Sequence, residues 1–171
     1  MAVGFHRGGG GHITLAIANG AGYGTWIDRE GPNAGRVDVT PLRPEGNEEI
    51  ASSFALPTGG IHGATAAGNK IFFAPADGVC WVDATGPSAS AQVLHISLGT
   101  DPDTEKPRRT GAFAVHRDRV LFVTGSGEDS ALGLLDAELT HVWRAWFEDY
   151  AASSKSCGDR YPGDEWRRTR L

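Results

Sequence analysis

The sequence predicts an all-β fold, and three observations lead to this prediction. Short runs of β-branched and aromatic residues alternate with polar residues at period two, as in half-buried strands. Gly, with 24 copies, and Pro, with 9, interrupt the chain so often that no long amphipathic helix fits. The runs also recur along the chain in the same order, which predicts a repeat architecture.

The repeat is clearest in two segments, residues 69–98 and 118–146. In these segments "NKIFFAPADG" is similar to "DRVLFVTGSGED", "VCWVDA" to "LGLLDA", and "QVLHISL" to "HVWRAWF". Each copy has a turn, an apolar run, a second turn and a run that ends in Asp. Asp83 and Asp136 therefore take equivalent places.

A third copy is expected upstream, in "HITLAIANG", "GTWIDRE" and "GRVDVTPL". In this alignment Trp26-Ile27-Asp28 matches Trp81-Val82-Asp83 at an offset of 55 residues. A short element precedes each triplet: "GFH" at 4–6 repeats as "GIH" at 60–62, an offset of 56, and "RRTGAFAVH" fills the same place in the last copy. A unit thus holds about four strands in roughly 50 residues, the size of a propeller blade.

We therefore expect a partial β-propeller of about three four-stranded antiparallel blades in residues 1–149, with an irregular C-terminal tail in residues 150–171. The blades are expected at about residues 1–45, 55–100 and 108–148. A meandering β-sandwich is the alternative. Since closed propellers have about four to eight blades, this chain is expected to be an incomplete propeller: a fragment, a frame-shifted product, or a subunit whose missing blades another chain supplies.

Composition excludes several classes of partner and location. The formal net charge of -5 leaves no sequence-wide basic field, so nucleic acid is not expected as the main partner. The apolar runs are shorter than the roughly 18–20 residues that span a bilayer, so no membrane insertion is expected. "MAVGFHRGGGG" lacks the charged leader and apolar core of a signal peptide. Two free thiols are expected at Cys80 and Cys157, and a disulfide between them stays open because it needs Cα atoms within about 7 Å.

Two histidines are the candidate metal ligands. His6 and His62 occupy the same place at the entrance of the innermost strand of adjacent predicted blades, and imidazole nitrogen is a common ligand of Zn²⁺. The alternative is that each imidazole hydrogen-bonds a loop carbonyl. His116 lies at the far end of the same strand in the last unit, about 20 Å away at about 3.3 Å per residue. It is the candidate for a second site.

No catalytic residues are expected. The chain has no Gly-x-Ser-x-Gly elbow of an α/β-hydrolase and no signal for a nucleophile beside a base. A metal-dependent propeller hydrolase such as a lactonase would need carboxylate and Asn ligands at the channel, whereas Asp28, Asp83 and Asp136 are expected on outer strands. We therefore predict that the protein is not an enzyme, and a fragment of such a hydrolase is kept as an alternative.

The predicted strands around His62 resemble a known family. "LPTGGIHGATAAGNKIFFAPADGVCWVDA" resembles the His-Gly-containing blade of the bacterial periplasmic zinc metallochaperones of zinc ABC transporter systems. "GFHRGGGGHITLAIANG" and "RTGAFAVHRDRVLFVTG" are similar to the blades on either side, so the resemblance covers about residues 4–137. It implies a periplasmic or secreted location, with His6 and His62 as channel histidines. It also implies Zn²⁺ near the channel mouth and delivery of this zinc to the transporter's solute-binding protein.

The sequence thus favours a non-catalytic, zinc-binding or zinc-delivering propeller of a metal-uptake system. A propeller scaffold for protein interactions without metal is the alternative. A cytoplasmic location stays open because no export signal is visible, and the identity of the metal and the oligomeric state stay open as well.

Overall fold

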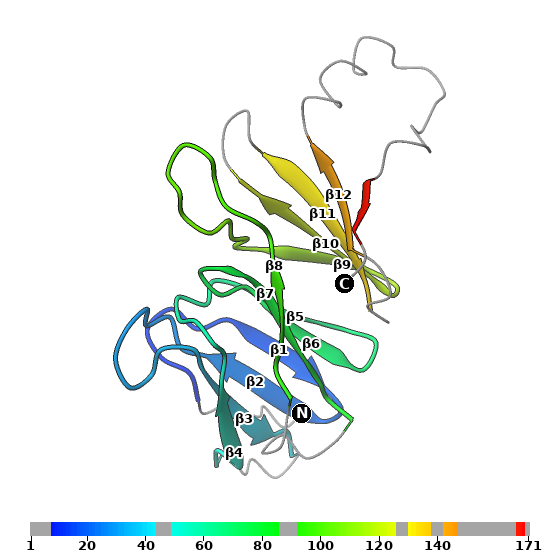
Figure 1. The fold of residues 1–171 in the computed structure, drawn as a ribbon. Helices are drawn as coiled ribbons and strands as arrows, with labels where there is room; N and C mark the ends of the chain where they lie inside the picture. Colours follow the sequence, from blue (N-terminus) through cyan, green and yellow to red (C-terminus); the bar gives the residue numbers. More distant parts are fainter. Residues whose placement is uncertain are drawn as a thin grey trace.

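The computed structural model describes residues 8–43, 49–85, 92–125, 130–137, 142–146 and 167–169. Within these ranges the chain forms 13 β-strands and no helix, which confirms the all-β prediction (Figure 1). None of the described residues belongs to a helix of the length and hydrophobicity needed to cross a membrane. The strands form three antiparallel sheets that follow one another along the chain, and no sheet in the described residues closes on itself.

Each sheet is a simple meander in which every strand pairs with the next. The first sheet contains β1 (Leu15–Ala18), β2 (Ala21–Thr25), β3 (Arg36–Pro41) and β4 (Ser52–Ala55). The second contains β5 (Ala64–Ala67), β6 (Lys70–Phe73), β7 (Gly78–Asp83) and β8 (Leu94–Ser97). The third contains β9 (Phe113–His116), β10 (Arg119–Thr124), β11 (Ala131–Asp136), β12 (Val142–Trp146) and β13 (Arg167–Thr169).

Two boundaries differ from the sequence prediction. The first sheet extends to Ala55, whereas the first blade was expected to end at about residue 45. The strand at 52–55 was missed because a connection of ten residues separates it from β3. Residues 167–169 lie in the predicted irregular tail but pair with the edge strand β12, whose backbone groups would otherwise lack partners. The rest of that tail lies outside the described residues.

The first two strands of each sheet give the true register of the repeat. Two-residue turns join them, and the first turn residue has a positive φ in all three: 48° at Asn19, 56° at Gly68 and 55° at Arg117. These positions are 19, 68 and 117, each 49 residues after the one before. Asn and Gly tolerate this left-handed conformation, whereas Arg adopts it at some cost.

The predicted alignment of the first copy, at offsets of 55 and 56, is therefore wrong. The segment "HITLAIANG" carries β1, which is equivalent to β5 and not to β6. Trp26-Ile27-Asp28 follows β2 and does not occupy the place of Trp81-Val82-Asp83 in β7. The equivalence of Asp83 and Asp136 holds, because they pair across the ladder with Lys70 and Arg119, the first residues of β6 and β10.

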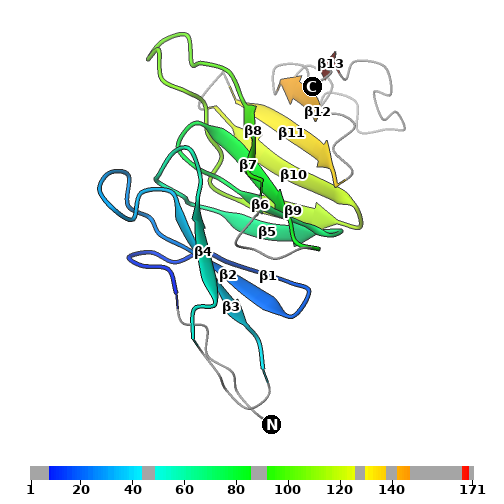
Figure 2. The ribbon, with the colours of Figure 1, turned by 60° about the horizontal axis from the view of Figure 1, so that its bottom comes forward.

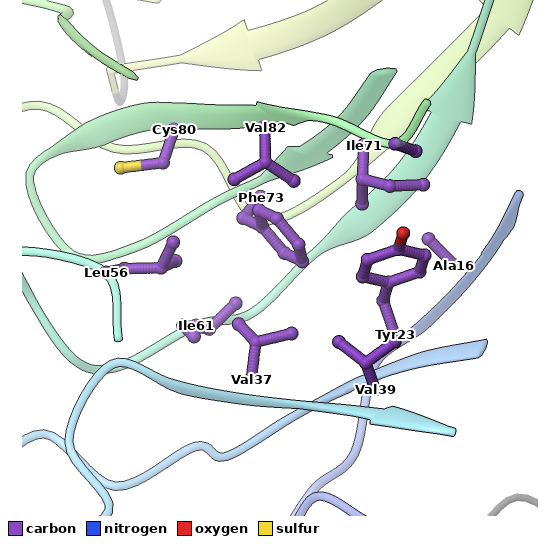
Figure 3. Close-up of a cluster of buried hydrophobic side chains, with 11 residues drawn as sticks. Ala16, Tyr23, Val37, Val39, Leu56, Ile61, Ile71, Phe73, Cys80 and Val82 are labelled. Carbon is purple, nitrogen blue, oxygen red and sulfur yellow. The ribbon is translucent and has the colours of Figure 1, made fainter. Parts of the chain in front are cut away.

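The three sheets pack face to face, and the second is covered on both sides (Figure 2). Alternation at period two separates its side chains: Ile71 and Phe73 pack toward the first sheet, and Phe72 between them packs toward the third. All three side chains are fully buried. Figure 3 shows the first of these interfaces, where Tyr23 and Val37 of the first sheet point toward the side chains of the second. The opening strands also lie near one another, β1 beside β5 and β5 beside β9.

Candidate functional site

The loops that open the three sheets meet at one end of the stack. We call residues 8–14, 58–63 and 107–112, which precede β1, β5 and β9, the entrance loops. His62 is held in the second of them because its N–H donates to the Ala74 carbonyl at 3.0 Å, and the Ala74 N–H donates to the Gly63 carbonyl at 2.9 Å. These bonds extend the β5–β6 ladder. The side chain of Ile61, the preceding residue, is fully buried and fixes the loop to the core.

Glycines allow the loops to approach one another. A Cβ at Gly59 would lie 2.4 Å from the Asp28 carbonyl oxygen, so only glycine fits there. A Cβ at Gly60 would lie 3.2 Å from Cγ of Arg29, which shows that this side chain crosses the second entrance loop. A Cβ at Gly63 would lie 3.0 Å from the Gly111 carbonyl oxygen in the third loop. Chain segments of all three sheets thus converge around His62.

The surroundings of His62 are positively charged. Its imidazole is half-buried, and burial lowers the pKa of His62, with further lowering by the positive charges of Arg109, Arg29 and His12. The exposed guanidinium groups of Arg29 and Arg109 come from the β2–β3 loop and from the third entrance loop. The site therefore favours a neutral imidazole, an anion, or both, and it disfavours a second cation.

The predicted zinc pair is not assembled by the described residues. His6 lies outside them, so its distance from His62 is not defined. By the 49-residue register, His62 is equivalent to Ile13 and to Gly111, so the offset of 56 does not make His6 its counterpart.

The described residues around His62 do not by themselves supply a complete set of zinc ligands. The described residues contain no group of three or more His, Cys, Asp or Glu side chains that could hold a metal ion. Zn²⁺ in proteins takes four ligands, usually with three or more from the protein. The charged neighbours of His62 are arginines, which repel the ion.

His116 lies apart from the entrance loops. It is the last residue of β9, whereas the third entrance loop precedes the first residue of that strand. His116 is exposed and pairs across the ladder with Arg119, whose guanidinium Nη1 lies 3.4 Å from Oδ2 of Asp136. In the described part of the chain, His116 does not belong to a group of three or more His, Cys, Asp or Glu side chains that could hold a metal ion.

A second polar cluster was missed from the sequence. The hydroxyl of Thr58 donates to Oδ2 of Asp77, and Nε2 of His95 lies 3.3 Å from the other carboxylate oxygen. The carboxylate stands between the hydroxyl and the imidazole, so the imidazole does not accept the hydroxyl proton as a catalytic base would. His95 is exposed, and its pairing with Asp77, eighteen residues away in the sequence, needed the three-dimensional structure.

Cys80 is the cross-strand neighbour of His95 and is a free, fully buried thiol. Burial, with a smaller effect of the Asp77 charge, raises the pKa of Cys80 to about 12. A thiol of this kind is unreactive at neutral pH. Cys157 lies outside the described residues.

No protein-family model matches the sequence, and no curated protein matches it. The fold is thus three consecutive antiparallel β-sheets of four or five strands, packed face to face, with arginine side chains close to the loops that open the sheets. The resemblance to zinc metallochaperones stays an expectation from the motifs around His62.

Proposed function

We propose that the chain is a non-catalytic binding protein on a partial β-propeller, and that the entrance loops bind a carboxylate- or phosphate-bearing ligand. The observation that carries this proposal is the close approach of three chain segments at His62: Arg29 of the β2–β3 loop contacts Gly60, and Gly111, two residues after Arg109, contacts Gly63. Two guanidinium groups and the N–H of a neutral imidazole supply hydrogen-bond donors for an anion.

The propeller part of the proposal is supported by the packing. Each sheet has four strands in meander order, the third with β13 added at its edge, and each lies face to face with the next. The opening strands β1, β5 and β9 are neighbours, as innermost strands are around the channel of a propeller. Ligands of such folds would meet the loops at the ends of these strands.

The non-catalytic part is supported by the chemistry of the described side chains. The Cys80 thiol is buried, and the Thr58 hydroxyl donates to the Asp77 carboxylate and not to an imidazole. Zinc delivery, the alternative from the motifs, would need ligands that the arginines around His62 do not supply.

Calorimetry on the purified chain tests the proposal with two probes, inorganic phosphate and Zn²⁺, at low ionic strength. We expect phosphate to bind weakly, with Kd of about 1 mM, and to be displaced by salt. The double variant Arg29→Gln, Arg109→Gln should lose this binding. Arg117→Gln is the matched control, because it removes an exposed charge at the opposite end of β9.

The Zn²⁺ titration distinguishes an anion-binding role of His62 from a zinc-binding role. Tight zinc binding that is lost in His62→Ala, together with no response to phosphate, would overturn the anion proposal in favour of zinc. Far-UV circular dichroism of each variant shows whether the β fold is intact.

A further inference from the structure

Each sheet has two faces, and the repeat makes them comparable. We call the face toward the next sheet the trailing face and the face toward the preceding sheet the leading face. Tyr23, Phe72 and Leu121 are equivalent trailing-face residues, at positions 23, 72 and 121, each 49 residues after the one before. Tyr23 and Phe72 are buried under the next sheet, at 3% and 0% exposure, but Leu121 is only partly buried.

The trailing face of the third sheet is apolar and open. Val123 beside Leu121 is 52% exposed, and the cross-strand partners of these two residues are Leu132 and Leu134, both partly buried. A hollow of about 520 Å³ lies along β9 and β10, lined by Leu121, Val123, Leu132 and Ala114 of this face together with Phe122 and residues 110–113. On the first and second sheets, apolar faces at these positions are covered by the next sheet of the same chain.

The leading face of the first sheet lies at the other end of the stack, and no sheet of the described residues covers it. Ile13, Leu15 and Ile17 alternate along the chain onto this face and are 50%, 43% and 55% exposed. Their neighbours on β2, Gly24 opposite Leu15 and Gly22 opposite Ile17, have no side chains to cover them. In the second sheet the same two places hold Ile71 and Phe73, which pack against the preceding sheet.

We propose that two copies of this chain associate head to tail. The trailing face of the third sheet of one copy packs on the leading face of the first sheet of the other, and a two-fold axis repeats the contact. The partner is a second copy because the chain already makes this kind of contact twice: the first sheet packs its trailing face on the second sheet, and the second sheet packs its trailing face on the third. The proposed contact repeats this packing between two chains. Both unmatched faces belong to the same chain at opposite ends of the stack (Figure 2).

Two copies would bring six sheets into one ring, within the roughly four to eight blades of closed propellers. A two-fold arrangement satisfies both open faces at once, whereas a head-to-tail contact that does not close gives filaments. This inference rests on the propeller architecture proposed above. The two faces include Ile13 and residues 110–112 of the entrance loops, but they do not include His62, Arg29 or Arg109.

Sedimentation velocity on the full chain is the first test. We expect a species of about 36 kDa, twice the 18.1 kDa of one chain, that dissociates on dilution. A chain that stays monomeric up to about 100 µM, well above the Kd of a typical specific interface, overturns the inference. A monomer with a β-rich circular-dichroism spectrum and intact phosphate binding would remove the dimer and leave the proposed function standing.

Two substitutions then test the head-to-tail geometry. Leu121→Glu and Ile17→Glu should each abolish the dimer, and an equimolar mixture of the two variants should regain a weaker dimer, because one of its two contacts contains only unchanged faces. Ile50→Glu, at an isoleucine that is 42% exposed outside these faces, should leave the dimer intact. If Leu121→Glu alone dissociates the dimer and Ile17→Glu does not, the contact is between two trailing faces and the proposal is wrong. If a Glu variant does not fold, Leu121→Ser and Ile17→Ser are used in the same mixing design.

Discussion

The indole Nε1 of Trp26 donates a hydrogen bond of 2.8 Å to Oδ2 of Asp38, a carboxylate that is completely buried. The backbone N–H of Gly9 donates to the same oxygen at 2.9 Å, and Nε of Arg36 donates to Oδ1 at 2.8 Å. Three donors from the N-terminal segment, the end of β2 and the start of β3 therefore share one acceptor residue. This polar cluster holds the first entrance loop against the first sheet.

We expect Asp38→Asn to lower the free energy of unfolding by about 2–4 kcal/mol, because the amide keeps one acceptor oxygen and turns two N–H groups toward donors. Urea denaturation measures the loss. Arg36→Gln is the matched control and should cost about 1 kcal/mol or less, since the Arg36 side chain is 37% exposed and its ion pair is partly screened. Equal stabilities of Asp38→Asn and the unchanged chain would show that the cluster does not stabilise the fold.

The same cluster predicts an acid transition. Burial alone would raise the pKa of Asp38, but the hydrogen bonds from Gly9, Trp26 and Arg36 lower it below its ordinary value. A depressed pKa in the folded state means that the stabilisation is present above the unfolded pKa of about 3.9 and is lost as pH falls through the folded pKa. Denaturation midpoints between pH 5 and pH 2 should therefore fall more steeply in the unchanged chain than in Asp38→Asn, and parallel curves would contradict this.

Phe72 is fully buried at the centre of the stack, so truncation of its side chain should strongly destabilise the fold. We expect Phe72→Ala to lower the free energy of unfolding by about 3–5 kcal/mol, through lost apolar burial and the cavity left between two sheets. Leu121→Ala is the control at the equivalent position of the third sheet, and it should cost about 1 kcal/mol at concentrations where the chain is monomeric, because that side chain is already partly exposed. Similar losses in the two variants would mean that the trailing face of the third sheet is covered in the monomer.

The sequence was sufficient for most of the strands, although not for β4 and β13, and it was insufficient for the register of the first copy. Period-two alternation and glycine turns predict short strands, and the Asp at the end of the third strand identifies β7 and β11 as equivalent. The first copy was misaligned because "HITLAIANG" and "NKIFFAPADG" have the same pattern although they carry β1 and β6. The positive-φ turn at Asn19-Gly20, which joins β1 directly to β2, was the local signal that would have corrected it.

The candidate site shows a similar limit. His62 was selected from the sequence because "GIH" at 60–62 repeats "GFH" at 4–6, an equivalence that the 49-residue register does not support. Arg29 was missed because it belongs to the loop between β2 and β3 of another sheet, and it reaches His62 only through the close approach of Gly60. Arg109 was visible in "RRTGAFAVH", directly before β9, but its charge was given no role.

The Cys80 thiol should be inert in the folded protein. Its pKa, raised to about 12, leaves almost no thiolate at pH 8, and burial blocks access. In a chain with Cys157→Ser, where Cys80 is the only thiol, we expect no reaction with a thiol reagent under native conditions and full reaction in denaturant. Rapid labelling of the native variant would show that the interface between the first two sheets opens readily.

His62 should make the protein less stable in mild acid. The imidazole has a folded-state pKa below its ordinary value, first because it is buried and then because of Arg109, Arg29 and His12. As pH falls through the unfolded pKa of about 6.5, the unfolded state binds the proton first, so the free energy of unfolding decreases until the folded pKa is passed. Urea midpoints in buffers without phosphate or carboxylate should fall more between pH 8 and pH 5 in the unchanged chain than in His62→Gln.

Arg29→Gln should give an intermediate slope, because it removes one of the charges that oppose protonation. Added phosphate should flatten the pH dependence of the unchanged chain, since a bound anion favours the imidazolium. The same pH dependence in all three proteins would show that the folded state does not lower the pKa of His62.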